Sequence, residues 1–174
     1  AVDPSPAAAS FAGPDMTVVP DAASIPAGFA PAAIVLAVKP QSAAEALPAY
    51  ARFAGKSVFL SIMAGRTIGG IRGLLGDGAA IVRAMPNTPA AVRQGVTVAC
   101  PSPSVTAEQR ALCDRLLQAI GVVAWADDEG LLDPVTAVSG SGPAYVFLLA
   151  ELMEKAALEQ GIPPDLARLL ARQT

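Results

Sequence analysis

Short apolar runs alternate with helix-like patterns over the first 126 residues of the chain. Several of these runs lack the polar–apolar alternation of half-buried strands, which is typical of strands buried on both faces in a parallel sheet. Alternation of strands and helices predicts an α/β sheet with right-handed crossovers. The expected strands are residues 17–19, 33–38, 57–62, 79–85, 95–100 and 121–126.

Three segments between these runs have helical patterns: residues 41–53, 67–75 and 106–120. The third pattern is the clearest, because Thr106 can cap the helix with Gln109 in the capping-box position three residues later. Leu112, Leu116 and Ile120 predict an apolar stripe along it.

The character of the chain changes after Trp125, so we divide it into residues 1–126 and 127–174. An acidic turn, "DDEG", leads into a region without a convincing strand. Pro143 suits the first turn of a helix that is apolar nearly all round over 145–158 and ends at Gly161. About a dozen residues of a second helix follow. These helices cannot bury their own surface, so we expect them to pack on further residues, on another subunit, or on both.

Composition excludes several classes of protein. Of 174 residues, 53% are hydrophobic and 16% charged; the net charge is −3, and there is no His. The scattered Lys and Arg do not form a nucleic-acid surface, and the lack of His removes the commonest metal ligand. The two cysteines have neither metal nor redox spacing, so we expect buried or inert thiols, no metal and a reducing, cytoplasmic location. The longest apolar run, 144–150, is too short to span a membrane.

Three candidate motifs stand at the ends of expected strands, where open parallel sheets bind ligands. In "AVKPQ" (37–41), Lys39 either faces a phosphate or snorkels from a strand end. In "SIMAGRT" (61–67), small residues let a flat ring approach, while Thr67 either joins the site or caps the next helix. In "MPNTP" (85–89), Asn87 offers donors and an acceptor between two prolines, or simply forms a turn. Arg83 and Arg93 flank this loop.

Two further features have a functional and a structural interpretation. "SGSGPAY" (139–145) places small hydroxyls and amides at a helix start, which suits a substrate carboxylate or, more simply, close helix packing. Glu129 in the acidic turn suits a cationic or N–H group, or only covers the turn. No pattern typical of a nucleophile, paired carboxylates or a metal cluster is visible, so the catalytic residues are left unassigned.

Taken in order, "AVKP", "MAGRT", "RAMPNTP", "VRQGVT" and "SGSGPAY" resemble the pyrroline-5-carboxylate reductase family over essentially the whole chain. The resemblance implies reduction of 1-pyrroline-5-carboxylate to L-proline with NAD(P)H, the last step of proline synthesis. It implies an incomplete Rossmann-type parallel sheet (1–126) followed by the first part of an all-helical dimerisation and substrate domain (127–174). It also implies a dimer or a ring of dimers, formed through the apolar helix.

The resemblance places the first two motifs against the dinucleotide and "MPNTP" at its nicotinamide end. Glu129 matches an acid near the family's substrate site. The implied cofactor contacts are Ala37, Val38, Lys39, Pro40, Ile62, Met63, Ala64 and Asn87.

The chain departs from the family pattern at both ends. The Gly-rich G-x-G-x-x-G/A loop that binds the pyrophosphate is not present, which on the usual spacing corresponds to roughly thirty residues. The chain also stops before a later Ser/Gly/Thr-rich loop that holds the substrate carboxylate. We therefore expect this polypeptide alone to be inactive. Asp3 ends the first visible strand and favours NADH, whereas the adjacent "PSP" can admit the NADPH phosphate, so both cofactors stay open.

Two alternatives remain beside the reductase. One is a related dehydrogenase or imine reductase that acts on another substrate; the hydroxy-acid enzymes of this architecture use an interdomain Lys, and here Lys155 lies away from "SGSGPAY". The other is a non-catalytic fragment that dimerises through its apolar helix.

Overall fold

A central five-stranded sheet organises the protein, and the computed structural model describes residues 1–174. The strands follow one another across the sheet in chain order. Five of the six expected strands are confirmed. They are β1 (Ala33–Leu36), β2 (Val58–Ser61), β3 (Ala80–Met85), β4 (Gly95–Pro101) and β5 (Gly121–Trp125).

The sheet is mixed rather than wholly parallel. β1, β2 and β3 run parallel, β4 runs antiparallel to β3, and β5 runs parallel to β4. The expectation of parallel crossovers throughout is therefore wrong at β3–β4. The connection over residues 86–94 is too short for a crossover of a dozen or more residues, so the chain returns beside β3 as an antiparallel neighbour.

The helices are α1 (Ala43–Ala46), α2 (Ile68–Leu75), α3 (Ala107–Gln118), α4 (Leu132–Val135), α5 (Gly142–Glu159) and α6 (Pro164–Gln173). The capping box of Thr106 and Gln109 is confirmed at the start of α3. The single helix expected over 41–53 is wrong. Only α1 is α-helical, and 3₁₀ segments flank it at Pro40–Ser42 and Leu47–Phe53. Pro48 has no N–H to donate, so an α-helical ladder cannot continue through it.

Two hydrophobic clusters fill the two faces of the sheet. Successive β2 side chains point to opposite faces, so Phe59 joins one cluster while Val58 and Leu60 join the other. The first cluster lies under α1, α2 and α4, and the second lies under α3. The stripe expected on α3 is confirmed in part: Leu112 is half-buried against the second cluster, whereas Leu116 is exposed. The fully buried positions of α3 are Cys113 and Leu117.

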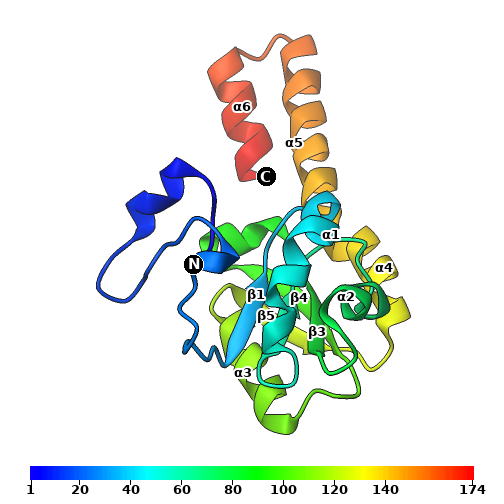
Figure 1. The fold of residues 1–174 in the computed structure, drawn as a ribbon. Coiled ribbons are helices and arrows are strands. Elements are labelled where there is room, and N and C mark those ends of the chain that lie inside the picture. The colour runs from blue at the N-terminus through cyan, green and yellow to red at the C-terminus, as the bar shows by residue number, and fades with distance from the viewer.

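The N-terminal segment forms no strand of the sheet. Residues 17–19 make a single parallel bridge, Val2 to Val19, so the strand expected there is wrong. Two backbone bonds join the pair, from the Val19 N–H to the Ala1 carbonyl at 2.9 Å and from the Asp3 N–H to the Val19 carbonyl at 3.0 Å. The pairing does not continue because the next N–H in line, that of Ser5, donates to the Asp3 side chain. In Figure 1 this segment lies to the left of the sheet.

The C-terminal helices form an arm, defined here as α5 and α6, which stands off the body above the sheet in Figure 1. A continuous helical stretch runs from Glu129 to Glu159, and by length and composition it is apolar enough to cross a membrane. Gly161, with a φ of 81°, turns the chain into α6, as the sequence predicted. The large apolar side chains of α5 are exposed in the single chain: Tyr145, Val146, Phe147, Leu148, Leu149, Leu152 and Leu158.

Candidate functional site

The carboxyl ends of β1, β2 and β3 meet at one edge of the sheet, since these three strands are parallel. The loops that follow them carry "AVKP", "IMAGR" and "MPNTP". Arg66 joins the first two loops, because its Nε donates to the carbonyl of Pro40 at 2.8 Å. The structure therefore brings together the three motifs that the sequence singled out.

The predicted contact residues differ in what they present at this edge. Ala37, Val38 and Lys39 are exposed, and Pro40 and Ile62 are half-buried. Ala64 is exposed beside Gly65, whose φ of 68° turns the backbone outward. Met63 is 2% exposed and packs in the core, so only its backbone can meet a ligand.

Thr67 ends this loop by capping α2. Its side chain accepts the N–H of Gly70 at 3.1 Å. Of the two interpretations given for Thr67, a site residue or a helix cap, this bond supports the helix cap. The capping interpretation of Thr67 is therefore confirmed.

Glu129 reaches the same edge from the start of the helical stretch. Its Oε1 lies 3.0 Å from Nη1 of Arg83 and also accepts the N–H of Ile68 at 2.7 Å. The Arg83 side chain is only 6% exposed, whereas that of Glu129 is 28% exposed. Both bonds end on Oε1, which leaves Oε2 free to meet a ligand.

Asn87 has partners within the chain at both ends of its amide. Its Oδ1 accepts the N–H of Val96 at 2.9 Å, and its Nδ2 donates to the carbonyl of Ser139 at 3.2 Å. The cofactor contact expected from Asn87 stays a prediction. The contact that the structure describes joins the β3–β4 loop to the helical stretch.

"SGSGPAY" lies within the helical stretch and has no free helix N-terminus. A π-helical turn over Thr136–Gly140 precedes α5, and the hydroxyls of Ser139 and Ser141 donate to the carbonyls of Val135 and Thr136. A Cβ on Gly140 would lie 3.3 Å from Met85 Cε. Close packing is therefore what this segment does in the single chain.

Both cysteines are buried and free, as expected. Burial raises the pKa of Cys113 to about 11. Burial is also the largest cause that raises the pKa of Cys100, and Glu129 is the next. Neither thiol is activated for chemistry at neutral pH.

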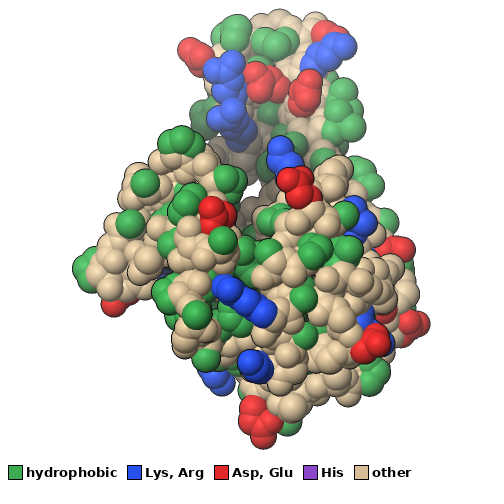
Figure 2. Space-filling model, viewed as in Figure 1, with side chains coloured by type: hydrophobic (Ala, Val, Ile, Leu, Met, Phe, Trp, Pro, Cys, Tyr) green, Lys and Arg blue, Asp and Glu red, His purple; other side chains and the backbone are tan.

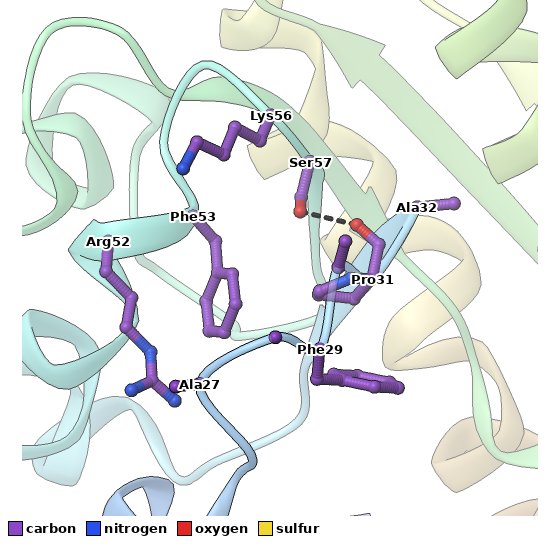
Figure 3. A pocket seen from close by; sticks show the side chains of 10 residues that line it. Ala27, Phe29, Pro31, Ala32, Arg52, Phe53, Lys56 and Ser57 are labelled. Atoms are coloured by element: carbon purple, nitrogen blue, oxygen red, sulfur yellow. Dashed lines mark hydrogen bonds between the residues drawn. The ribbon is translucent and has the colours of Figure 1, made fainter.

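A cavity of about 430 Å³ lies at the opposite edge of the sheet. Figure 3 shows Arg52, Lys56 and Phe53 around it, with Ser57 donating to the carbonyl of Pro31. No predicted site residue lines this cavity. Arg52 already donates to the carbonyls of Ala22 and Ile25, so the candidate site remains at the carboxyl ends.

Sequence comparison with curated proteins identifies the relatives of the chain. It is 41% identical to the pyrroline-5-carboxylate reductase of Pseudomonas aeruginosa over 142 residues, which cover 81% of this chain and 52% of the relative. It is 38% identical to pyrroline-5-carboxylate reductase 2 of Bacillus subtilis over 141 residues, covering 81% of this chain and 50% of the relative. The family model for pyrroline-5-carboxylate reductase dimerisation matches residues 129–174. The chain matches the pyrroline-5-carboxylate reductase family over about four fifths of its own length.

Solved structures of this reductase family share the fold. A pyrroline-5-carboxylate reductase from Coxiella burnetii aligns with a TM-score of 0.80 at 33% identity, covering 90% of this chain and 58% of that one. The Plasmodium falciparum pyrroline carboxylate reductase, solved with NADP bound, aligns at 0.76 with 31% identity, covering 82% and 54%. The chain thus spans about half the length of the reductases it matches.

Sequence reasoning gave no role to Arg83 or Arg66. A signal for Arg83 was present: a charged residue within the apolar run of β3 is rarely buried unless it has a partner. Glu129 is 46 positions away along the chain, and no local pattern links them. Arg66 gave no comparable signal.

Proposed function

We propose that this chain forms part of an enzyme that reduces 1-pyrroline-5-carboxylate to L-proline by hydride transfer from NAD(P)H. The observation that carries the proposal is the meeting of three strand-end motifs at one edge, in a chain 41% identical to the Pseudomonas aeruginosa reductase. Ligands of open α/β sheets bind at that edge.

The residues at this edge fit a dinucleotide. Lys39 is an exposed cation that can meet a phosphate, and the guanidinium of Arg66 lies beside Pro40. An added Cβ on Gly65 would meet no atom, so a flat ring can approach the bare backbone there. NADP is supported by the cofactor in the Plasmodium falciparum relative. NAD stays the second candidate, although Asp3 lies outside the sheet and its carboxylate accepts the N–H of Ser5 at 2.8 Å.

Glu129 is proposed as the substrate-binding residue of this chain. Arg83 and the Ile68 N–H hold Oε1, so the direction of the carboxylate is fixed before any ligand binds. Oε2 then faces a cationic imine with its charge only partly offset by Arg83. A preorganised carboxylate of this kind stabilises positive charge without reorganising.

In the proposed reaction the protein mainly orients the two reactants and stabilises charge. NAD(P)H supplies the hydride when bound. The side chains here hold the two reactants at near-attack distance and stabilise the charge of the imine. A protonated imine is already activated, so the reaction does not require a histidine acid.

Self-association is proposed through α5 and α6. Seven large apolar side chains of α5 are exposed in the single chain, and a soluble monomer rarely leaves so many together in water. The dimerisation family model covers this region. Glu154 pairs with Arg168 of α6 at 3.4 Å, and Glu151 and Lys155 lie on the same helix, which suits a water-facing arm better than a lipid-spanning one. We therefore propose that a second copy of the chain covers the apolar side chains of α5. The resulting assembly is a dimer or a ring of dimers. A cytoplasmic location is proposed with it, because both thiols are free.

A chimera tests the proposal. This chain replaces the matching segment of the Pseudomonas aeruginosa reductase, and substrate-dependent oxidation of NADPH and NADH is measured. We expect turnover with pyrroline-5-carboxylate. A folded, self-associated chimera that binds the dinucleotide but does not reduce the imine would support a different substrate. A folded chimera that binds no dinucleotide would support the non-catalytic alternative.

A further inference from the structure

Asn87 connects three separate parts of the molecule through one amide group. It follows β3, it accepts a backbone N–H from Val96 of β4, and it donates to the carbonyl of Ser139 in the helical stretch. The two partners require opposite groups, because Val96 offers a donor and Ser139 offers an acceptor. An asparagine side chain supplies both, whereas a carboxylate supplies only acceptors.

The carbonyl of Ser139 needs a donor from outside the helix. In an α-helix it would accept the N–H of residue 143, four positions on, but that residue is Pro143 and has none. In π-helical geometry it would accept the N–H of Ala144, but this group donates to Ser141 at 3.0 Å. Asn87 Nδ2 supplies the bond at the position where the helix does not.

The contact stands at the point where the arm leaves the body. Below it, Arg83 and Glu129 tie the start of the helical stretch to β3. At the π-turn itself, Gly140 packs closely against Met85. Above it, Figure 1 shows α5 rising away from the sheet, and Figure 2 shows a hollow between the arm and the body. Asn87 is the polar contact that joins the body to the helix at this point.

We infer that Asn87 is a positioning residue that replaces the missing N–H of Pro143 and so fixes the direction in which the arm leaves the sheet. The bond lies where the helix changes from π to α geometry, a place where a long helix bends. The consequence for catalysis rests on the proposed function. The arm would carry the second copy, and its direction sets where that copy lies relative to the strand ends.

The distance between two spin labels tests the inference on the 174-residue chain itself. The labels are attached at Ala111→Cys on α3 and Glu159→Cys at the end of α5, both exposed positions. Labelled chain is diluted with unlabelled chain so that distances within one copy are measured. The native cysteines are buried and stay unlabelled. The variants are Asn87→Asp and Asn87→Ala, and the matched control is Thr88→Ala, an exposed neighbour in the same loop.

Asn87→Asp is the informative variant, because it keeps an acceptor for Val96 and loses the donor to Ser139. We expect one narrow distance distribution for the unmodified chain and for Thr88→Ala. For Asn87→Asp and Asn87→Ala we expect a broader or shifted distribution with the helical circular dichroism retained. An Asn87→Asp distribution identical to that of the control overturns the inference.

A second measurement needs no variant. Hydrogen exchange at the Asn87 side-chain amide of the unmodified chain is followed by NMR. We expect slowed exchange, and exchange at the rate of a free asparagine amide overturns the inference even if both variants fail to fold. Neither experiment uses dinucleotide or imine, so failure of the positioning role is distinguishable from failure of the proposed reductase activity.

Discussion

Oε1 of Glu129 lies 3.0 Å from Nη1 of Arg83 and also accepts the backbone N–H that opens α2. One oxygen therefore ties together β3, α2 and the start of the helical stretch. Arg83 is nearly buried, so the carboxylate balances a charge that water does not reach. Asp133 adds a second contact at 3.4 Å, but its side chain is 83% exposed.

Glu129→Gln should lower the free energy of unfolding by about 2 kcal/mol, because it leaves the guanidinium of Arg83 without its buried counter-charge. Asp133→Asn is the control and should cost less than about 0.5 kcal/mol, as expected for an exposed partner. Urea unfolding followed by circular dichroism measures both. If both variants lost the same free energy of unfolding, Glu129 would not be the more important partner of Arg83. In the chimera, Glu129→Gln should also weaken substrate use, and unchanged kinetics would remove Glu129 from the substrate site.

Gly121→Ala should prevent folding or cost at least about 3 kcal/mol. Gly121 has a φ of 146°, and an added Cβ would lie 1.9 Å from the carbonyl oxygen of Gly95 across the β4–β5 pair. Gly73→Ala is the control within α2, where an added Cβ meets nothing within 4 Å. That variant should gain about 0.5–1 kcal/mol from helix propensity. Thermal unfolding of both variants checks the pair, and a tolerated Gly121→Ala would contradict the β4–β5 register.

The strands were predictable where the residues of a segment are so apolar that the segment must be buried. Runs such as 57–62 are apolar enough to require burial on both faces, and β2 is buried throughout. Whether β4 runs parallel or antiparallel to β3 depends on the length of the loop between them. Nine residues are too few for a parallel crossover, and the apolar pattern of the strands carries no information about this. Pro48, inside the expected 41–53 helix, breaks the α-helical ladder because it has no N–H to donate.

The candidate site was predictable as motifs but not as contacts. The strand ends could be placed on one edge because parallel strands end together. The partners of Glu129 and Asn87 lie 46 and 52 positions away, and the fold alone brings them together. A motif also does not show which of its side chains face a ligand. The motif of Met63 lies at the edge of the sheet, but the Met63 side chain packs in the core.

Lys39→Glu should weaken dinucleotide binding by the chimera about tenfold or more, because a cation at the strand end is replaced by a charge that repels phosphate. Lys56→Glu makes the same change of charge at the opposite edge of the sheet, beside the cavity of Figure 3, and should leave binding unchanged. Fluorescence titration with NADPH and NADH measures both. Equal weakening would mean that the effect is one of net charge, and the site would not be at the strand ends.

Stability should fall as pH rises above about 9. The pKa of Cys113 is raised from 9.0 to about 11 in the folded protein, so the unfolded chain loses its thiol proton first. The unfolded state then binds fewer protons, and the stability present below pH 9 is lost between about 9 and 11, with a slope of at most about 1.4 kcal/mol per pH unit. Urea unfolding across this range checks the slope against Cys113→Ala, in which that part of the slope should disappear.

Leu149→Asp should reduce self-association, because it places a carboxylate among the exposed apolar side chains of α5, where Leu149 is 59% exposed. Val92→Asp introduces the same charge at a 70% exposed apolar residue outside the arm and should leave association intact. Sedimentation velocity over a range of concentrations distinguishes the two. Unchanged association of Leu149→Asp would move the interface away from α5.

The exposed apolar side chains of α5 also bear on how the chain matures. Under the proposed self-association, a copy that has folded but not met its partner holds these side chains in water, so folding of the arm and assembly would form one equilibrium. Its midpoint then depends on protein concentration, as for an obligate dimer. Dilution alone should lower the thermal midpoint, and newly made chains at low abundance would be the ones that chaperones and proteases encounter.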